Sequence, residues 1–465
     1  MSSSARQVRT LWLWGAAALI LVLALGRLWW LPAYAPHNIN EGWNAGHVAR
    51  AFGPGSLYPD PDALIANNYP PLSFFVVGLA ARISGDTIIT GRIVSLLSEI
   101  AVGLAVYAIV ARLTGSRLWA TAGALLFAGF ATTLLRGYLA MNDPQWLAQA
   151  AMIGGLLLLV PRAPGARLST ATVIGAAAIT VAGGLIKHNL VAFPAAATVW
   201  LLVADRRALG VWIASGLAFA ALACAALFAI WGTAVFLDVL APARSYSLLR
   251  MAAHGVPLLL FALPGLLASR PLLGGSREDK RLLLPVWLLA VALPTAILQR
   301  SGDGVDINAT FETAIALAIA VPVACSLRTN AAWRWLGIAA LPALALVPRA
   351  LIADARELIG RDAAVAGWRP FITAVATAEG PVACDDQALC HWAGRRSAMD
   401  FFAMKQRLLK DDVPALRSAL DARTFTLIAM RSENPGWHEN RLIPAIRERY
   451  RTVYEADGYE LLVPK

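Results

Sequence analysis

Two carboxylates stand in short polar motifs that interrupt long apolar stretches. Glu41 lies in Asn38-Ile-Asn-Glu-Gly-Trp-Asn44, directly after the first apolar run. Asp143 lies in Met141-Asn-Asp-Pro-Gln145, where the proline can open a helix. A carboxylate can take the proton of an attacking hydroxyl, and paired acids can position an acceptor or bind a divalent cation. The alternative is that each acid caps a helix, because acidic and amide side chains stabilise the first helical turn.

Basic residues near the same face supply the opposite charge. Lys187, His188 and Asn189 follow Gly183-Gly-Leu-Ile at the junction of two apolar runs. An ionisable group at membrane depth is costly, and a cation here suits a phosphate leaving group near the membrane surface. A snorkelling lysine in a short loop is the alternative. Three later residues are further candidate phosphate ligands, namely Arg244, Tyr246 and Arg250.

Two other polar features lie in or beside apolar segments. Glu99 is inside the second apolar run and must face the interior of a bundle or a partner such as Arg92, one heptad earlier. A polar group before the tenth run contains Asp303, Asp306, Asn308 and Glu312. Helix capping explains that group as well as substrate binding does.

The composition is that of an integral membrane protein. Of 465 residues, 58% are hydrophobic and 15% are charged, whereas soluble domains have about one-quarter charged residues. The net charge of +11 comes from basic residues that stand singly or in pairs between apolar runs. This pattern argues against nucleic-acid binding. The first apolar run continues past Arg27 without a cleavage motif, which predicts a membrane span and not a secretory signal.

Eleven segments fit the roughly 20 apolar residues that a helical span requires. A further segment, 70–84, is too short to span and is expected to lie along the interface. The sequence therefore predicts a mainly α fold, a polytopic bundle of about 11 spans with juxtamembrane helices. The expected spans are 11–34, 88–111, 118–135, 144–161, 168–187, 189–204, 208–232, 253–269, 282–299, 310–327 and 333–351.

With 70–84 at the interface, the basic loops collect on one side, which the positive-inside rule makes cytoplasmic. They contain Arg112 with Arg117, Arg162 with Arg167, Arg206 with Arg207, the stretch 270–281, and Arg328 with Arg334. The opposite side receives 35–87, 136–143, the junction near Lys187, 233–252, 300–309 and the chain after 353. We therefore expect a cytoplasmic N-terminus and an active site that faces away from the cytoplasm.

Hydropathy falls beyond residue 352, which divides the chain into two expected parts. They are a membrane module at 1–352, with a catalytic first outer loop at 35–87, and a soluble extracytoplasmic α/β domain at 353–465. Expected strands are 382–384, 425–430 and 459–463, and expected helices lie near 398–409, 413–422 and 441–450. This domain carries no recognisable catalytic motif, so its expected role is structural or in acceptor binding.

Two of the four cysteines, Cys384 and Cys390, lie in this C-terminal part. They are six residues apart, so they can form a local disulfide if the domain is outside the cytoplasm. Two free thiols are the alternative. Four cysteines are too few for a disulfide framework, and the other two, Cys224 and Cys325, lie inside apolar runs where they are expected to pack as small apolar residues.

The order of the motifs resembles that of the GT-C glycosyltransferases, integral membrane enzymes that use lipid-phosphate-linked sugars. The resemblance is to the branch with the protein O-mannosyltransferases and the lipid A aminoarabinose transferase, and it covers roughly the first half of the chain. It rests on Asn40-Glu-Gly-Trp-Asn44, Asn67-Asn-Tyr-Pro-Pro-Leu72, Gly91-Arg92, Asn142-Asp-Pro144 and Lys187-His-Asn189.

The resemblance implies an inverting transfer from a polyprenyl-phosphate sugar to a lipid, glycan or protein acceptor. In that scheme Glu41 activates the acceptor hydroxyl, Asp143 positions the acceptor or an ion, and Lys187 with His188 stabilises the departing phosphate. Arg244, Tyr246 and Arg250 would add phosphate contacts. The implied substrate-binding residues are Asn40, Asn44, Asn68, Tyr69 and Arg92.

The same resemblance implies a bacterial inner-membrane enzyme with a periplasmic active site, among membrane lipids. A divalent cation, Mg²⁺ or Mn²⁺, would be bound by Glu41 and Asp143. This chain has Asn40-Glu41 where many members have two adjacent acids, so one potential carboxylate ligand is missing.

Two other functions remain open. A transporter or flippase of lipid-linked sugars also needs many spans and intramembrane charge, but it often contains internal repeats, and none is evident here. A non-catalytic binder of lipid-linked sugars would tolerate neutral replacements of Glu41 and Asp143 while still binding its ligand.

Overall fold

In the computed structural model, the described residues are 3–60, 62–240, 245–275, 278–328, 330–409, 413–432 and 441–465. In these ranges, eleven helices correspond one to one with the eleven expected spans, although their ends differ. They are α1 (Ser3–Trp30), α4 (Thr87–Thr114), α5 (Arg117–Thr132), α6 (Gln145–Leu159), α7 (Thr170–Ile186), α8 (Ala192–Ala204), α9 (Arg206–Trp231), α11 (Leu248–Ala268), α13 (Leu283–Arg300), α14 (Phe311–Ser326) and α15 (Ala332–Thr377). The last of them runs to residue 377, which is 26 residues past the expected end at 351.

Short elements connect these helices. Seven of the helices in the described ranges are long and apolar enough to cross a membrane, and α3, α6, α7 and α8 are shorter apolar helices. The expectation of a mainly helical membrane bundle is confirmed. The short elements are α2 (Ile39–Ala51), α3 (Leu72–Ser84), η1 (Arg136–Tyr138), α10 (Ala234–Leu240), α12 (Leu272–Gly275), η2 (Lys280–Leu282) and η3 (Ile307–Thr310).

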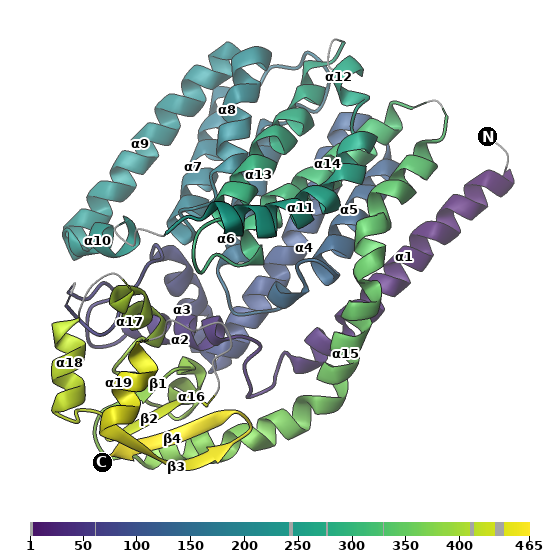
Figure 1. Cartoon of the computed structure of the whole chain (residues 1–465). Coiled ribbons are helices and arrows are strands. Elements are labelled where there is room, and N and C mark those ends of the chain that lie inside the picture. The colour runs from purple at the N-terminus through teal and green to yellow at the C-terminus, as the bar shows by residue number, and fades with distance from the viewer. Residues whose placement is uncertain are drawn as a thin grey trace.

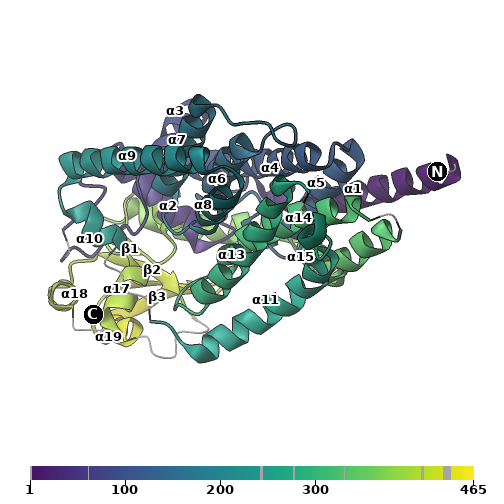
Figure 2. The same ribbon diagram turned by 90° about the horizontal axis from the view of Figure 1, so that it is seen from above.

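Helix α14 forms the centre of the bundle, where nearly all of its residues are buried. At the edge, α9 is apolar all round, and only Ala208 and Trp212 are buried. Figures 1 and 2 show α9 along one flank, with α11 and α15 on another. An apolar helix that leaves most of its surface uncovered is suited to contact lipid.

The bundle has two distinct polar ends, joined by helices such as α4. Twenty residues separate Arg92 from Arg112 along this helix, which puts the two ends about 30 Å apart. At the Arg112 end, Arg112 donates to the carbonyls of Leu157 and Val160, and Arg281 donates to those of Arg112 and Pro161. The loops predicted to be basic therefore do meet at one end of the molecule.

Helix α3 stays at the opposite end and does not cross. Before it, the Leu64 carbonyl accepts a hydrogen bond from the Asp400 backbone, and after it, Asp86 accepts one from Trp392. Both partners belong to the C-terminal domain. The two ends of α3 are therefore on the same side, as the interfacial assignment of 70–84 requires.

The C-terminal domain is built on a four-stranded sheet with the order β1-β2-β4-β3. The β1–β2 pair is parallel, and the other two pairs are antiparallel. Alternate side chains of β2 enter two different cores, Ile428 against the helices after α16 and Leu427 against the end of α15. The elements are β1 (Val382–Cys384), α16 (Gln387–Trp392), α17 (Phe401–Leu408), α18 (Pro414–Asp421), β2 (Leu427–Arg431), α19 (Leu442–Arg449), β3 (Tyr450–Ala456) and β4 (Tyr459–Pro464).

The expected strands correspond to β1, β2 and β4, whereas β3 was not predicted. Strands β3 and β4 form a hairpin whose two-residue turn is Asp457-Gly458, with φ of 48° and 76°. Asp-Gly favours this left-handed turn because glycine has no side chain to oppose a positive φ.

Helix α15 joins the membrane bundle to this domain without a break. It passes through residue 353, the expected domain boundary, and reaches the sheet (Figure 1). Halfway along it, Asp354 and Glu357 form ion pairs of 3.0 and 2.8 Å with Arg136, and Glu357 also pairs with Arg27 of α1 at 3.2 Å. This buried network fixes α15 to two other elements, and the boundary at 353 stays a prediction.

Candidate functional site

Glu41, in the first turn of α2, is completely buried and fully hydrogen-bonded. Its Oε1 accepts from Arg92 Nε at 2.8 Å and from the Asn142 backbone at 3.0 Å. Its Oε2 accepts from Arg92 Nη2 and from the His37 backbone, both at 2.7 Å. Four N–H donors satisfy this carboxylate, and two of them belong to the bidentate Arg92 guanidinium, so Glu41 has little remaining capacity to accept a further hydrogen bond.

Arg92, in the first turns of α4, is equally enclosed. Beyond Glu41, it donates to the carbonyls of Leu31, Ala33 and Ala35 at 2.8 to 2.9 Å, and to that of Trp30 at 3.3 Å. One guanidinium thus ties the chain between α1 and α2 onto α4. Its donors are occupied within the protein, so the contacts of Arg92 are those of a structural anchor.

Asn142 completes this frame. Its side chain donates to the Glu41 carbonyl at 3.0 Å, and its own carbonyl accepts from Asn44 Nδ2 at 3.0 Å. A Cβ at Gly91 would overlap the Asn142 side chain, so glycine is needed there for the close approach. The motifs containing Glu41, Arg92 and Asn142 form one interlocked unit, called here the Glu41 frame.

Asp143, the residue after Asn142, lies beside the buried ammonium group of Lys187. Asp143 Oδ1 accepts from the Gln145 backbone at 2.8 Å and lies 3.4 Å from Lys187 Nζ. The other oxygen, Oδ2, is buried and has no hydrogen-bond partner in the described part of the chain. Lys187 Nζ also lies 4.9 Å from the centre of the Tyr69 ring. An unpartnered buried carboxylate oxygen is costly, which marks Asp143 as a point where a ligand can donate a hydrogen bond.

A second polar group extends from Asp143 towards the surface. Burial raises the pKa of the Tyr138 hydroxyl, and the nearby Asp143 and Asp306 carboxylates raise it further. The protonated hydroxyl donates to Asp306 Oδ2 at 3.1 Å, and Asp306 lies 3.9 Å from Arg300. The Asp306 side chain is 59% exposed. Polar groups therefore lead from the buried acid to the solvent.

Not all of the remaining predicted site residues lie near Asp143 and Lys187. His188 is exposed next to Lys187, and Asn40 and Asn68 are half-buried near the Glu41 frame and Tyr69. Arg250 instead pairs with Asp303 at 3.4 Å, and Tyr246 is 64% exposed. Arg244 lies outside the described residues.

The C-terminal domain packs directly against the helix that bears Glu41. A Cβ at Gly42 would overlap the backbone of Ala388 in α16. Next to this contact, Trp43 Nε1 donates to Asp400 at 2.8 Å. In the structure Cys384 and Cys390 are joined by a disulfide, with their Cα atoms 6.0 Å apart, and this bond links α16 to β1. The domain is therefore a direct support of α2.

A divalent cation shared by Glu41 and Asp143 does not fit these contacts. Both oxygens of Glu41 are occupied by donors that include the Arg92 guanidinium, and Asp143 is adjacent to the Lys187 ammonium. In the described ranges, no group of three or more His, Cys, Asp or Glu side chains is arranged to bind a metal. The two predicted ligands are instead neutralised by cations of the protein itself.

Sequence reasoning missed three features of this site. Tyr138 and Arg300 lie in segments without a distinctive motif, and their proximity to Asp306 depends on how η1 and α13 pack. Gly42 was noted only as part of its motif, although the spacing of Gly42, Gly46 and Ala49 along one helical face indicates close packing.

The fold of this chain is similar to those of solved protein structures, although comparisons of its sequence find no match. No protein-family profile matches the sequence, and no curated protein sequence matches it. The crystal structure of ArnT from Cupriavidus metallidurans in the apo state is similar, with a TM-score of 0.66, 16% identity, and 97% of this chain and 98% of that chain covered. ArnT bound to undecaprenyl phosphate gives a TM-score of 0.64 at the same identity and coverage.

The Archaeoglobus fulgidus oligosaccharyltransferase tethered with an acceptor peptide is a more distant match. Its TM-score is 0.51 at 12% identity, with 98% of this chain and 74% of that chain covered. Both proteins have the GT-C fold, and the present chain has it as well. The resemblance predicted from the motif order is confirmed at the level of the fold.

Proposed function

We propose that this chain is a membrane glycosyltransferase that moves a sugar from a polyprenyl-phosphate donor to a hydroxyl of a lipid, glycan or protein acceptor. The unpartnered Oδ2 of Asp143 beside Lys187 carries the proposal. The GT-C fold supports it, because the similar ArnT structure contains undecaprenyl phosphate. Substrate and reaction are inferred here from the site and from this likeness.

The proposed reaction is a single displacement with inversion at the anomeric carbon. The acceptor hydroxyl donates to Asp143 Oδ2, transfers its proton there, and forms a bond from its oxygen to the anomeric carbon. The bond from that carbon to the phosphate oxygen breaks, and the lipid phosphate leaves with the electron pair. The ammonium of Lys187 has three N–H donors, so it can contact Asp143 and still donate to the departing phosphate.

Glu41 takes a different role in this proposal from the one that its motif suggested. Its carboxylate is saturated by Arg92 and two backbone N–H groups. We therefore assign it as a positioning residue that sets the place of Asn142 and, through it, of Asp143. The neighbouring Asn40 is half-buried and carries an amide, which can bind a sugar hydroxyl but cannot act as a base at neutral pH.

We further propose that the end of the bundle with Glu41, Asp143 and the C-terminal domain faces away from the cytoplasm of a bacterial cell. The gathering of basic loops at the opposite end supports this orientation. The disulfide of the C-terminal domain supports it independently, because such bonds persist outside the cytoplasm. Reporter fusions after Arg207 and Lys465 test it, and a cytoplasmic signal from both positions would contradict it.

The decisive experiment for the activity supplies the purified full-length protein with a panel of polyprenyl-phosphate sugars and candidate acceptors. Transfer releases free lipid phosphate in amounts equal to the glycosylated acceptor. We expect release with at least one donor. A protein that binds the donors without releasing lipid phosphate would be a binder or a transporter, and the proposed reaction would be wrong.

A further inference from the structure

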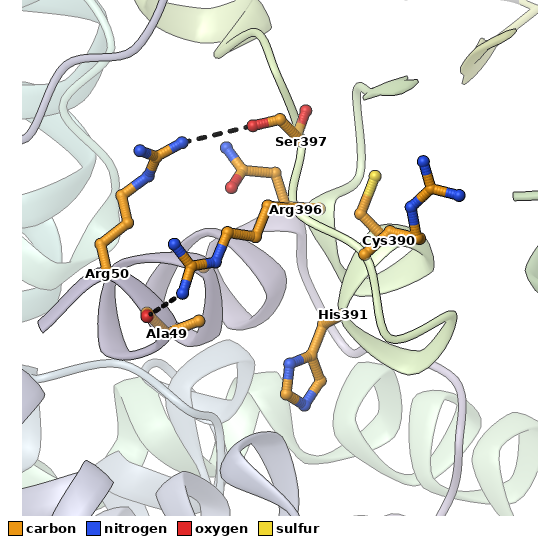
Figure 3. Close-up of a pocket in the computed structure, with 9 residues that line it drawn as sticks. Ala49, Arg50, Cys390, His391, Arg396 and Ser397 are labelled. Atoms are coloured by element: carbon orange, nitrogen blue, oxygen red, sulfur yellow. Dashed lines mark hydrogen bonds between the residues drawn. The ribbon is translucent and has the colours of Figure 1, made fainter. Parts of the chain in front are cut away.

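A small pocket lies between α2 and the C-terminal domain (Figure 3). The space that the centre of a water molecule can occupy in it is about 20 Å³. Arg50 lines it from α2 and lies nine residues after Glu41. Because an α-helix has 3.6 residues per turn, nine residues rotate a side chain by about two and a half turns. The pocket is therefore on the opposite side of α2 from the Glu41 frame. Its polar lining from the domain consists of Gln387, His391, Arg395, Arg396 and Ser397.

Three arginines line this pocket, and two of them, Arg50 of α2 and Arg396 of the domain, lie on its two sides. Arg50 donates to the Ser397 carbonyl at 3.4 Å, and Arg396 donates to the Ala49 carbonyl at 2.8 Å (Figure 3). Arg396 also donates to the carbonyl of Pro54. Arg395 likewise donates only to backbone carbonyls. Within the described ranges, none of the three forms an ion pair with an acidic side chain.

Two carboxylates interact with residues of the pocket, Asp400 with Arg50 and Asp86 with His391, and both also accept hydrogen bonds from other groups. Asp400 accepts from Trp43 and from the Ala403 backbone, and Asp86 accepts from Trp392 and from the Ile89 backbone. Asp400 raises the pKa of Arg50, but burial and the neighbouring Arg396 lower it by more. Burial lowers the pKa of His391 as well, so this ring is neutral at pH 7 and the charge comes from the arginines.

We propose that this pocket binds a phosphate group, carried by an anionic lipid headgroup or by free phosphate. Planar guanidinium forks match the geometry of phosphate oxygens, and an anion relieves the repulsion between neighbouring arginines. The Gln387 side-chain amide adds a polar group at the same wall. The pocket adjoins α2, at the end of the bundle where α3 lies along the expected interface, which puts it within reach of lipid headgroups.

Binding there joins two parts of the chain. Arg50 belongs to α2, whereas Arg395 and Arg396 belong to the C-terminal domain. A phosphate that contacts both sides adds an ionic link to the Gly42–Ala388 packing nearby. We therefore expect the ligand to stabilise the docked domain, independently of the sugar-transfer reaction.

The test measures the thermal midpoint Tm of the full-length protein in two arms. The first adds inorganic phosphate to protein in neutral detergent, with chloride at the same ionic strength as reference. The second compares nanodiscs of phosphatidylcholine with nanodiscs that contain phosphatidylglycerol. At ligand tenfold above its dissociation constant we expect a rise on the order of 1–2 °C. The first arm reports free phosphate as the source, and the second reports a lipid headgroup.

The variants Arg50→Gln and Arg396→Gln separate this site from general ionic effects. Each should lose the Tm rise in whichever arm shows it, while Arg451→Gln, at an exposed position of β3, should keep it. A rise that all variants share equally would overturn the proposal, as would the absence of a rise in both arms. Because the readout is Tm, failure of the proposed transfer activity would leave this result interpretable.

Discussion

Glu41 and Arg92 form an ion pair in which neither side chain is exposed, with 2.7 Å between Oε2 and Nη2. Removing one partner of such a pair leaves the other charge buried without compensation, at a cost of about 3–5 kcal/mol. We therefore expect Glu41→Gln to lower the Tm by several degrees. Glu379→Gln, at an exposed position, is the matched control and should leave the Tm unchanged. A Glu41→Gln protein with full stability and no transfer would instead identify Glu41 as the base.

Close packing of α16 on α2 is tested at Gly42. An added methyl group would overlap the backbone of Ala388, which cannot move away as a flexible side chain can. Gly42→Ala should therefore loosen the C-terminal domain, measured as faster proteolysis near α16 and a lower Tm. Gly184→Ala is the control, because nothing lies within 4 Å of a Cβ there and alanine favours a helix. Equal proteolysis of the two variants would contradict the close approach.

The stability of the domain should depend on pH through Asp386. This N-cap of α16 is buried, and burial raises its pKa from 3.8 to about 7, although the Ala388 N–H lowers it in part. The folded-state pKa lies above the unfolded value. The contribution of the neutral carboxyl to the free energy of unfolding is therefore fully present below about pH 4 and is lost as the pH rises through 7.

The comparison with Asp386→Asn isolates this contribution. The free energy of unfolding of the native protein, relative to that of the variant, should fall from about pH 4 to 7 and level off above, with a slope of at most about 1.4 kcal/mol per pH unit. Buried His47, whose pKa burial lowers to about 3, acts in the opposite direction, but it is present in both proteins and cancels. A difference in the free energy of unfolding that is constant with pH would contradict the raised pKa.

Much of the fold could be predicted because it depends on hydrophobicity along the chain. The apolar runs located eleven helices of the bundle in the described ranges, and the distribution of arginines indicated which loops share an end. Strand β3 was missed because its residues after Tyr450 are mostly exposed and lack the alternation of a half-buried strand. The Asp457-Gly458 pair was the available signal for that hairpin.

The site was predicted only in part, because spacing reveals which motifs meet but not how their atoms pair. The motifs of Glu41, Arg92 and Asp143 do converge. Which carboxylate keeps an unpartnered oxygen depends on contacts across 51 and 101 residues of sequence, between Glu41 and Arg92 and between Glu41 and Asn142. Arg250 was predicted to contact phosphate, but it pairs with Asp303, and nothing in the sequence indicated that pairing.

The central claim is that Asp143, and not Glu41, accepts the proton of the acceptor hydroxyl. The most direct test is the rate of lipid-phosphate release by Asp143→Asn at saturating donor, beside Asp362→Asn, whose side chain in the native protein is 90% exposed. We predict a loss of at least about 100-fold for Asp143→Asn, measured below the Tm of the variant and with donor binding retained, and no loss for the control. Release by Asp143→Asn at the native rate would contradict the account.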